Sequence, residues 1–295
     1  MEASDMCIVK KPRISDYWSR HPALHASYCS QLVSRNRFMD ILSFLHVNDN
    51  TTFVPFPQDG HDPIHKVRPF ITHLNTRFQE VYVPQQNICV DEAMYPFKGC
   101  PKFRVYMKDK LTKWGFKFYE LCESSSGYVY RFEMFCADRN VSNKPYDVTM
   151  RLMEPLLNKG YHLYIDNYYC RPKLCHDLTM NGTRVCGTVR KNRVGMPKDL
   201  TGANLQKGQI YYRRKGPVVA CHWKDKKDVF MLSTMHRPTL RLTQARYELK
   251  EKPLAVISYI ANMADTDHSD QLISYFPMHR TAKNAPKQAT DWLYF

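Results

Sequence analysis

The sequence predicts an α/β fold, in which a mixed β-sheet with flanking helices follows a helical N-terminal region and contains a β-rich insertion. Three observations support this prediction. Apolar residues recur at helical spacing before residue 86, the elements of residues 87–190 follow the order β-β-β-α-β-α-β, and short β-rich runs occupy residues 191–253. With 295 residues, 43% of them hydrophobic, the chain is long enough to bury a sizeable core.

The first 86 residues are predicted to be mainly helical. Ser34 is an N-cap candidate, and apolar residues follow it at the spacing of a helix with one buried face: Phe38, Ile41, Leu42 and Leu45. A second helix, stopped by Pro84, is predicted from the same spacing of Val67, Ile71, Leu74, Phe78 and Val81. Residues 47–63 between them are rich in turn formers and are predicted to be a loop.

The predicted sheet begins with a short apolar run at residues 88–90 that ends at Asp91. Residues 115–137 contain two β-rich segments joined by SSSG, a hairpin signal. A helix disturbed by Pro155 precedes the buried strand YHLYID, which ends at Asp166. Another helix closes at Gly182, and residues 183–190 form a further strand. Because catalytic residues of open α/β sheets commonly sit at strand carboxyl ends, we expect Asp91 and Asp166 to meet.

The remaining elements are a β-rich insertion and a final helix. Short strands are predicted around residues 210–212, 218–222 and 229–233. The final helix is predicted to begin near Asp267 and to pack on the sheet through Leu272, Ile273 and Phe276.

The charge of the chain predicts a polyanionic partner. Lys and Arg number 43 against 28 Asp and Glu, a net charge of +15, which would attract the phosphates of nucleic acid. No run of 18 apolar residues predicts a membrane span, and the first 15 residues lack the core of a secretory signal, so we expect a soluble intracellular protein. The ten cysteines include no CxxC pair and are expected to be reduced and mostly buried.

Acidic residues gather in DTDHSDQL at 265–272. Asp267 and Asp270 would share one face of a helix, and at a helix N-terminus they could simply complement the helix dipole. Joined by Asp91 and Asp166, they would instead supply the oxygen ligands that two divalent cations need for phosphoryl transfer. From these residues alone, a simple role of Asp267 and Asp270 at a helix N-terminus stays an alternative to metal binding.

Six blocks of the sequence carry a family resemblance. They are VDEAMYPFKG at 90–99, KDKLTKWGFK at 108–117, YIDNYYCRPKL at 164–174, GTVRKNRVGMP at 187–197, WKDKKDVFMLST at 223–234 and NMADTDHSDQL at 262–272. In this order they resemble the blocks of the piggyBac transposases and the piggyBac transposable element-derived proteins. The resemblance covers nearly the whole chain.

The resemblance implies a ribonuclease H-like core whose catalytic aspartates correspond to Asp91, Asp166 and Asp267, with Asp270 as an additional essential aspartate. It implies metal-dependent DNA strand cleavage and strand transfer at TTAA sites, with these four aspartates as ligands of Mg²⁺ or Mn²⁺, two ions being expected. The implied partners are DNA and a second copy of the chain, as a homodimer, and the implied location is the nucleus. No organic cofactor site and no membrane contact are predicted.

The resemblance also divides the chain. The expected parts are a helical dimerisation and DNA-binding region at 1–86, the first part of the core at 87–190, the insertion at 191–253, the last helix of the core at 254–276, and the start of a C-terminal helical region at 277–295. The sequence stops before the cysteine-rich zinc-binding module of the family, so we expect a truncated copy whose independent transposition is in question.

Some residues depart from the family pattern and keep an alternative function open. Ala264 and Asp265 stand where the family has two glycines, and Cys100 stands where arginine is usual. The alternative is a domesticated, catalytically impaired DNA-binding protein derived from a transposase. A hydrolase with paired carboxylates, such as a glycosidase, would explain the acidic residues but not the net charge of +15.

Two basic groups are the predicted DNA contacts. The first contains Lys98, Lys102, Arg104, Lys108, Lys110, Lys113 and Lys117, and the second contains Arg190, Lys191 and Arg193. The aromatic residues interleaved with the first group, where exposed, could stack on an unpaired base; the alternative is that they belong to the core: Phe103, Tyr106, Trp114 and Phe116. Trp223 is expected either near DNA or as a buried anchor of the insertion.

Overall fold

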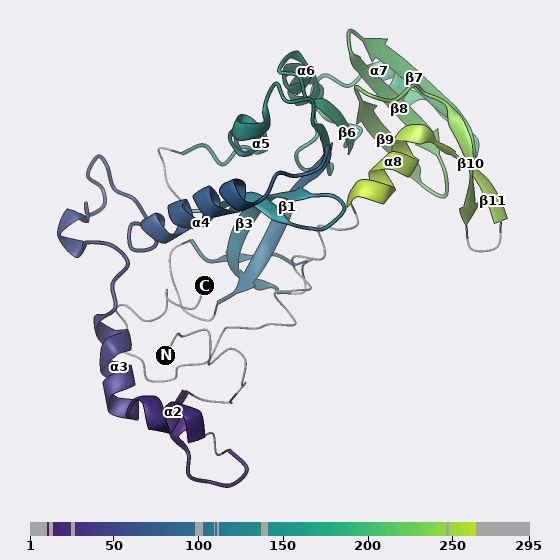
Figure 1. Cartoon of the computed structure of the whole chain (residues 1–295). Coiled ribbons are helices and arrows are strands. Elements are labelled where there is room, and N and C mark those ends of the chain that lie inside the picture. Colours follow the sequence, from purple (N-terminus) through teal and green to yellow (C-terminus); the bar gives the residue numbers. More distant parts are fainter. Residues whose placement is uncertain are drawn as a thin grey trace.

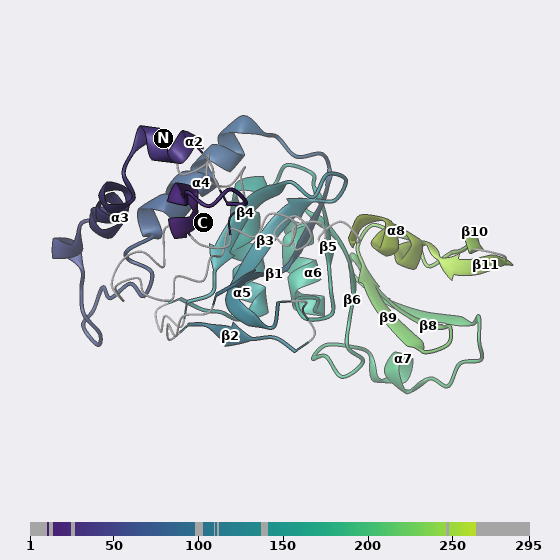
Figure 2. The same cartoon turned by 90° about the horizontal axis from the view of Figure 1, so that it is seen from below.

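The computed structural model describes residues 11, 14–24, 27–97, 103–108, 110, 112–136, 141–245 and 248–263. Its helical N-terminal region, its central sheet and its β-rich segment follow one another through the molecule (Figures 1 and 2). Helices α2 (Ser27–Leu32) and α3 (Arg35–Phe44) lie at one end, and the hairpin of β10 (Leu240–Ala245) and β11 (Glu248–Pro253) lies at the other.

The N-terminal region is helical, as predicted, and the predicted burial of α3 is confirmed at Phe38, which packs against Trp18, but not at two other positions. Its other elements are the 3₁₀ turns η1 (Ile14–Trp18) and η2 (Asn50–Thr52) and helix α4 (Arg68–Val81). Ser34 caps α3, because its side chain accepts a hydrogen bond from the Arg37 amide at 3.3 Å. Ile41 and Leu45, expected on a buried face, are 46% and 45% exposed. A helical period shows which residues share a face, but another element must be present to cover that face.

Helix α4 packs on β4 (Val129–Met134) at an edge of the sheet. The ring centroids of Phe78 and Phe132 lie 6.0 Å apart. The Asn75 side-chain amide accepts a hydrogen bond from the Phe132 N–H at 2.9 Å and donates one to the Phe132 carbonyl at 3.0 Å. The amide thus satisfies backbone groups of an edge strand, which would otherwise be open to other chains.

The central sheet confirms the predicted order β-β-β-α-β-α-β and adds one short strand. The predicted elements are β1 (Asn87–Pro96), β3 (Trp114–Glu123), β4, α5 (Pro145–Met153), β5 (His162–Ile165), α6 (Pro172–Met180) and β6 (Arg184–Thr188), and the added strand is β2 (Val105–Tyr106). The strand order is β2-β3-β1-β5-β6-β9-β8-β7, with β4 also paired to β3. Strand β1 is antiparallel to β3 and parallel to β5. Helix α5 gives way to the 3₁₀ turn η3 (Glu154–Leu156) at Pro155, as expected.

Side chains on alternate positions of the strands contribute to two separate cores. Ile88 and Val90 pack in the cluster that includes residues of α5 and α6. Cys89 packs in the cluster that includes Ala255 of α8 (Leu254–Met263). Because successive residues of a strand point to opposite faces, Asp91 follows Cys89 to the side of α8. Helix α8 precedes the helix expected near Asp267, and residues 264–295 lie outside the described part of the chain.

The β-rich segment after residue 190 extends the main sheet. It contains α7 (Lys198–Gly202), β7 (Ile210–Lys215), β8 (Val218–Lys224) and β9 (Asp228–Ser233). Strand β9 is antiparallel to β6, with Gly187 opposite Leu232, while β10 and β11 form a separate hairpin. Trp223 is 5% exposed and belongs to the core cluster beneath α8, which favours its role as a buried anchor. The predicted domain boundaries stay predictions.

Two glycines permit close approach of neighbouring backbones. A Cβ on Gly115 of β3 would lie 1.9 Å from the Tyr95 carbonyl oxygen of β1. A Cβ on Gly187 of β6 would lie 2.4 Å from the Ile165 carbonyl oxygen of β5. The first close approach explains the glycine of the KWG sequence at 113–115.

The cysteines of the described residues agree with the expectation of reduced, mostly buried thiols. These free cysteines are all buried: Cys89, Cys122, Cys136, Cys170, Cys175, Cys186 and Cys221. None of the helices among the described residues has the length and apolar character needed to cross a bilayer.

Candidate active site

Asp91 and Asp166 lie at the same edge of two neighbouring parallel strands. The parallel pairing of β1 and β5 runs up to Val90 opposite Ile165, so each aspartate is the next residue along its strand. The expectation that β1 ends at Asp91 is wrong, because β1 continues to Pro96 in antiparallel pairing with β3. The parallel pairing does end there, and this brings the two aspartates together.

Burial makes both aspartates harder to ionise. It raises the pKa of Asp91 to about 7, and the positive charge of Lys110 opposes this rise. Burial also raises the pKa of Asp166, although the backbone N–H groups of Tyr168 and Tyr169 donate to Asp166 Oδ1 at 2.8 and 3.4 Å. A bound cation would therefore stabilise the negatively charged form of both carboxyl groups.

Glu92 is a third carboxylate of this region, and the sequence analysis did not single it out. Its Oε1 lies 3.1 Å from Lys117 Nζ, with side chains only 9% and 11% exposed. The Lys117 ammonium also lies over the rings of Tyr119 and Tyr168, at 4.7 and 4.9 Å from their centroids. Lys117 thus lies inside the protein, which differs from the DNA-contacting surface predicted for it. The adjacent acidic residues "DE" at 91–92 were the feature of the sequence from which a role of Glu92 could have been predicted.

Lys110 also turns toward the site. Its Nζ donates to the Glu92 carbonyl, and its charge lowers the pKa of Asp91. The segment between β2 and β3 therefore folds back onto β1. Lys110 was predicted as a DNA contact, and its position gives it an electrostatic effect on the site itself.

Helix α8 contributes a tyrosine that the sequence analysis also missed. Burial raises the pKa of Tyr259, and the charges of Asp166 and Asp91 raise it further. Tyr259 lies one helical turn before Met263, the last described residue. Tyr259 of α8 therefore lies near enough to both aspartates to feel their charges.

The described residues supply two of the four ligands predicted for a divalent cation such as Mg²⁺. Asp91 and Asp166 offer carboxylate oxygens, which Mg²⁺ and Mn²⁺ prefer. Within the residues that the structure describes, no three His, Cys, Asp or Glu side chains gather as a metal-binding group. Asp267 and Asp270, which would complete the predicted ligand set, lie outside the described residues.

A loop after β6 is tied to the turn that carries Asp166. Arg193 donates through Nη2 to the carbonyls of Asn167 and, at 3.3 Å, Tyr168. Arg190 Nε donates to Asn167 Oδ1 at 2.9 Å. These arginines hold the loop against the site through hydrogen bonds, and Lys191 between them is exposed. Lys191 is the member of this basic group whose position best suits contact with a phosphate.

The members of the first basic group have different surroundings. Arg104 lies over the ring of Trp114, 4.6 Å from its centroid. Lys108 and Lys113 are exposed. Lys98 and Lys102 lie outside the described residues.

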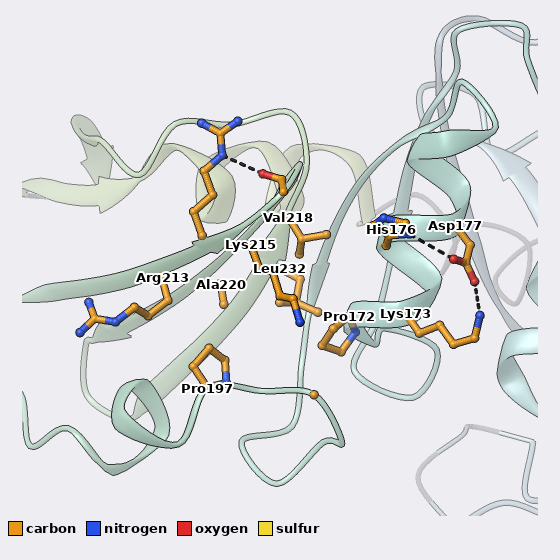
Figure 3. Close-up of a pocket in the computed structure, with 13 residues that line it drawn as sticks. Pro172, Lys173, His176, Asp177, Pro197, Arg213, Lys215, Val218, Ala220 and Leu232 are labelled. Carbon is orange, nitrogen blue, oxygen red and sulfur yellow. Dashed lines mark hydrogen bonds and ion pairs between the residues drawn. The ribbon is translucent and has the colours of Figure 1, made fainter.

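A separate pocket of about 600 Å³ lies between α6, the residues around Pro197 and the β7–β8 hairpin (Figure 3). Apolar residues form part of its lining, and Lys173, Arg213, Arg214 and Lys215 make it cationic. Ion pairs neutralise two of these charges, since Lys173 Nζ lies 2.6 Å from Asp177 Oδ2 and Arg213 Nε lies 2.6 Å from Asp199 Oδ2. The pocket is not lined by Asp91 or Asp166.

Comparisons with known proteins agree with the geometry. A family model described as "Transposase IS4" matches residues 5–294. The chain is also similar to a solved structure of a piggyBac transposase synaptic complex with hairpin DNA, with a TM-score of 0.77 and 22% sequence identity, over 92% of this chain and 57% of that chain. The mixed sheet with its helices therefore has the ribonuclease H-like fold.

Two human relatives are similar to this chain. PiggyBac transposable element-derived protein 3 is 27% identical over 290 residues, covering 91% of this chain and 47% of the relative. PiggyBac transposable element-derived protein 2 is 25% identical over 241 residues, covering 76% of this chain and 39% of the relative. The chain thus spans less than half the length of these curated relatives.

Proposed function

Because the chain belongs to the piggyBac-type Transposase IS4 family, we propose that it is the catalytic region of a DNA transposase. It cleaves DNA strands and joins them to TTAA targets by metal-dependent phosphoryl transfer. The observation that carries this proposal is the position of Asp91 and Asp166, one residue beyond the last parallel pair of β1 and β5. Catalytic carboxylates at such strand ends are typical of open α/β sheets.

The proposed ligands of two Mg²⁺ or Mn²⁺ ions are Asp91, Asp166, Asp267 and Asp270. When bound, such ions neutralise phosphate charge and stabilise the attacking and leaving oxygens of an in-line transfer. Lys110 favours the ionised form of Asp91, and the backbone N–H groups of Tyr168 and Tyr169 hold the Asp166 carboxylate in place. These groups thus favour the ionised form of Asp91 and fix the position of the Asp166 carboxylate, so that both can donate oxygen ligands to a metal ion.

The position of α8 supports the inclusion of Asp267. Helix α8 packs on β1, β5 and β6, and its Tyr259 lies close enough to Asp91 and Asp166 for their charges to raise its pKa. Asp267 follows Met263 by four residues, a span that bridges at most about 14 Å. A short connection is therefore enough to bring Asp267 to the edge of the sheet.

DNA is the proposed partner, with a second copy of the chain. The net charge of +15 supports DNA binding, and a solved relative of similar fold is a transposase synaptic complex with hairpin DNA. Exposed apolar side chains on the N-terminal helices support the homodimer, since Leu32, Ile41 and Phe44 are 49%, 46% and 80% exposed. Nuclear location follows from the proposed substrate.

The test is a strand-cleavage assay on DNA that carries the terminal repeats flanking the chain's own genomic copy. With Mg²⁺ or Mn²⁺ we expect nicking at the repeat end by the native chain, and about a hundredfold less by Asp91→Asn and Asp166→Asn, the upper end of what loss of a residue that only supports a metal ligand costs. Asp199→Asn is the control, because Asp199 is exposed and paired with Arg213. Equal nicking by all four proteins would overturn the proposed site.

The second candidate is a domesticated DNA-binding protein without productive catalysis. It is favoured by the relatives, which are named as transposable element-derived proteins. This candidate requires that the native chain bind the same DNA and leave it intact with either metal. DNA binding and strand cleavage, measured on one preparation, therefore separate the two functions.

A further inference from the structure

We propose that Tyr106 and Trp114 form a binding site for an unpaired nucleobase of the DNA substrate, an inference that rests on the proposed transposase function. Four aromatic residues of this segment were candidates from the sequence. The structure separates them, because Phe103 and Phe116 are 6% and 0% exposed whereas Tyr106 and Trp114 are each 51% exposed. Only the second pair offers ring surface to a ligand.

The two exposed rings lie together on a short hairpin. Tyr106 of β2 is directly opposite Trp114 of β3. Their ring centroids lie 4.9 Å apart, with the planes inclined by 48°. A flat base can therefore lie on one ring while its edge touches the other. Strand β2 ends the strand order on this side of the sheet (Figure 2), so a ligand can approach it.

The charges around the Tyr106–Trp114 pair select a nucleotide as its ligand. The Arg104 guanidinium lies 4.6 Å from the Trp114 centroid, and Lys108 and Lys113 are exposed on the same hairpin. Aromatic faces bind bases by stacking, and the cations suit the phosphates on either side of the base. An apolar peptide would use the rings but gain nothing from the exposed ammonium groups of Lys108 and Lys113.

The same hairpin is connected to the candidate active site. Lys110 donates to the carbonyl of Glu92, the residue after Asp91. Asp91 is opposite Glu120 in β3, six residues after Trp114, which corresponds to about 20 Å along the strand. At about 3.4 Å per nucleotide, this distance equals about six steps of a DNA strand. The Tyr106–Trp114 pair can thus hold a base of the same DNA whose phosphate reaches Asp91.

The test compares two duplexes with the same number of phosphates, measured by fluorescence anisotropy with the 295-residue chain. One duplex is fully paired, and the other has a single adenine opposite an abasic site. We expect the native chain to bind the unpaired adenine about tenfold more tightly, the size of one stacking contact. Trp114→Ala and Tyr106→Ala should remove this preference and keep their affinity for paired DNA within about twofold, because their phosphate contacts are unchanged. Trp114→Phe, which keeps an aromatic ring, should retain part of it.

Tyr212→Ala is the matched control, since Tyr212 is 49% exposed and lies on β7. It should keep the full preference. Replacing the unpaired adenine with 5-iodouracil adds a second readout, and photocrosslinking should label Tyr106 or Trp114 in preference to Tyr212.

The outcomes separate this inference from the proposed function. Equal affinity of the native chain for both duplexes, or an equal loss of both affinities in the alanine variants, would overturn the base-binding site and leave the DNA-binding function standing. Failure of the native chain to bind either duplex would overturn the proposed function, and the base-binding site with it.

Discussion

Asp91 and Glu92 are consecutive residues of β1 whose carboxyl groups interact with each other, and each also has neighbours of its own. Asp91 lies on the side of α8, where burial raises its pKa to about 7. Glu92 lies opposite Tyr119, which belongs to the core beneath α5 and α6, and is paired with Lys117. Glu92 is thus paired with a protein cation, although its charge still raises the pKa of Asp166, whereas the Asp91 carboxyl group has no ion pair of this kind among the described residues.

The pKa of Asp91 predicts how stability changes with pH in the absence of metal. The folded-state pKa is raised, so the contribution of Asp91 to stability is full below about pH 4, the pKa of an unfolded aspartate, and is lost as the pH rises through about 7. Each pH unit in this window is worth at most about 1.4 kcal/mol. Urea unfolding in EDTA should therefore show a smaller decrease from pH 5 to pH 7.5 in Asp91→Asn than in the native chain. An identical decrease would contradict the assigned environment of Asp91.

The Glu92–Lys117 pair predicts non-additive effects of substitution. Lys117→Met leaves a buried carboxylate without its cation and should lower the free energy of unfolding by about 3 kcal/mol. The double variant Glu92→Gln/Lys117→Met should recover most of this loss, because no uncompensated charge stays buried. Urea denaturation of the two single variants and the double variant gives the coupling energy. A coupling near zero would show that the pair is not formed.

At the scale of elements, contact between the backbones of β1 and β3 depends on a glycine. Gly115→Ala would place a methyl group 1.9 Å from the Tyr95 carbonyl oxygen, so β3 would have to move away from β1. We expect a loss of about 3 kcal/mol in the free energy of unfolding, the upper end of the usual cost of overpacking. Gly202→Ala is the control, because no heavy atom lies within 4 Å of the position its Cβ would take. Similar midpoints of urea unfolding for both variants would contradict the close approach.

The sequence was sufficient to predict most elements of the core. Turn signals and helical periods gave the order of β1 to β6 apart from β2, and the strand-end positions of Asp91 and Asp166 predicted their meeting. Strand β2 was missed because two residues are too short to show a period. Helix α8 was missed because LAVISYIANM is apolar at most positions and lacks a contrasting polar face.

Contacts between residues far apart in the sequence could not be predicted from local sequence patterns. The antiparallel contact of β9 with β6 joins residues about 45 apart and makes the β-rich segment part of the main sheet. Glu92 and Lys117 are separated by 25 residues, and the sequence instead suggested Lys117 as a DNA contact. Such contacts depend on the sheet's register, which several strands fix together.

At the scale of the whole molecule, the positively charged side chains have different roles: some bind other parts of the protein, and others are exposed to a ligand. Arg190 and Arg193 hold the turn after Asp166, whereas Lys191 is exposed. Lys191→Ala should weaken binding to all DNA sequences and reduce the slope of log affinity against log salt by about one. Lys159→Ala, another exposed lysine, should leave the slope unchanged. Anisotropy titrations at several salt concentrations measure both slopes, and equal slopes would exclude Lys191 as a phosphate contact.

The melting temperature measured with and without Mn²⁺ tests the metal site at Asp91 and Asp166 most directly. A ligand present at a hundredfold excess over its dissociation constant stabilises the folded state by about 2.7 kcal/mol, which should raise the melting temperature of the native chain by about 5 °C. Asp199→Asn should show the same rise, and Asp91→Asn and Asp166→Asn should show little or none. A rise of equal size in all four proteins, or no rise in the native chain, would contradict the proposed metal site.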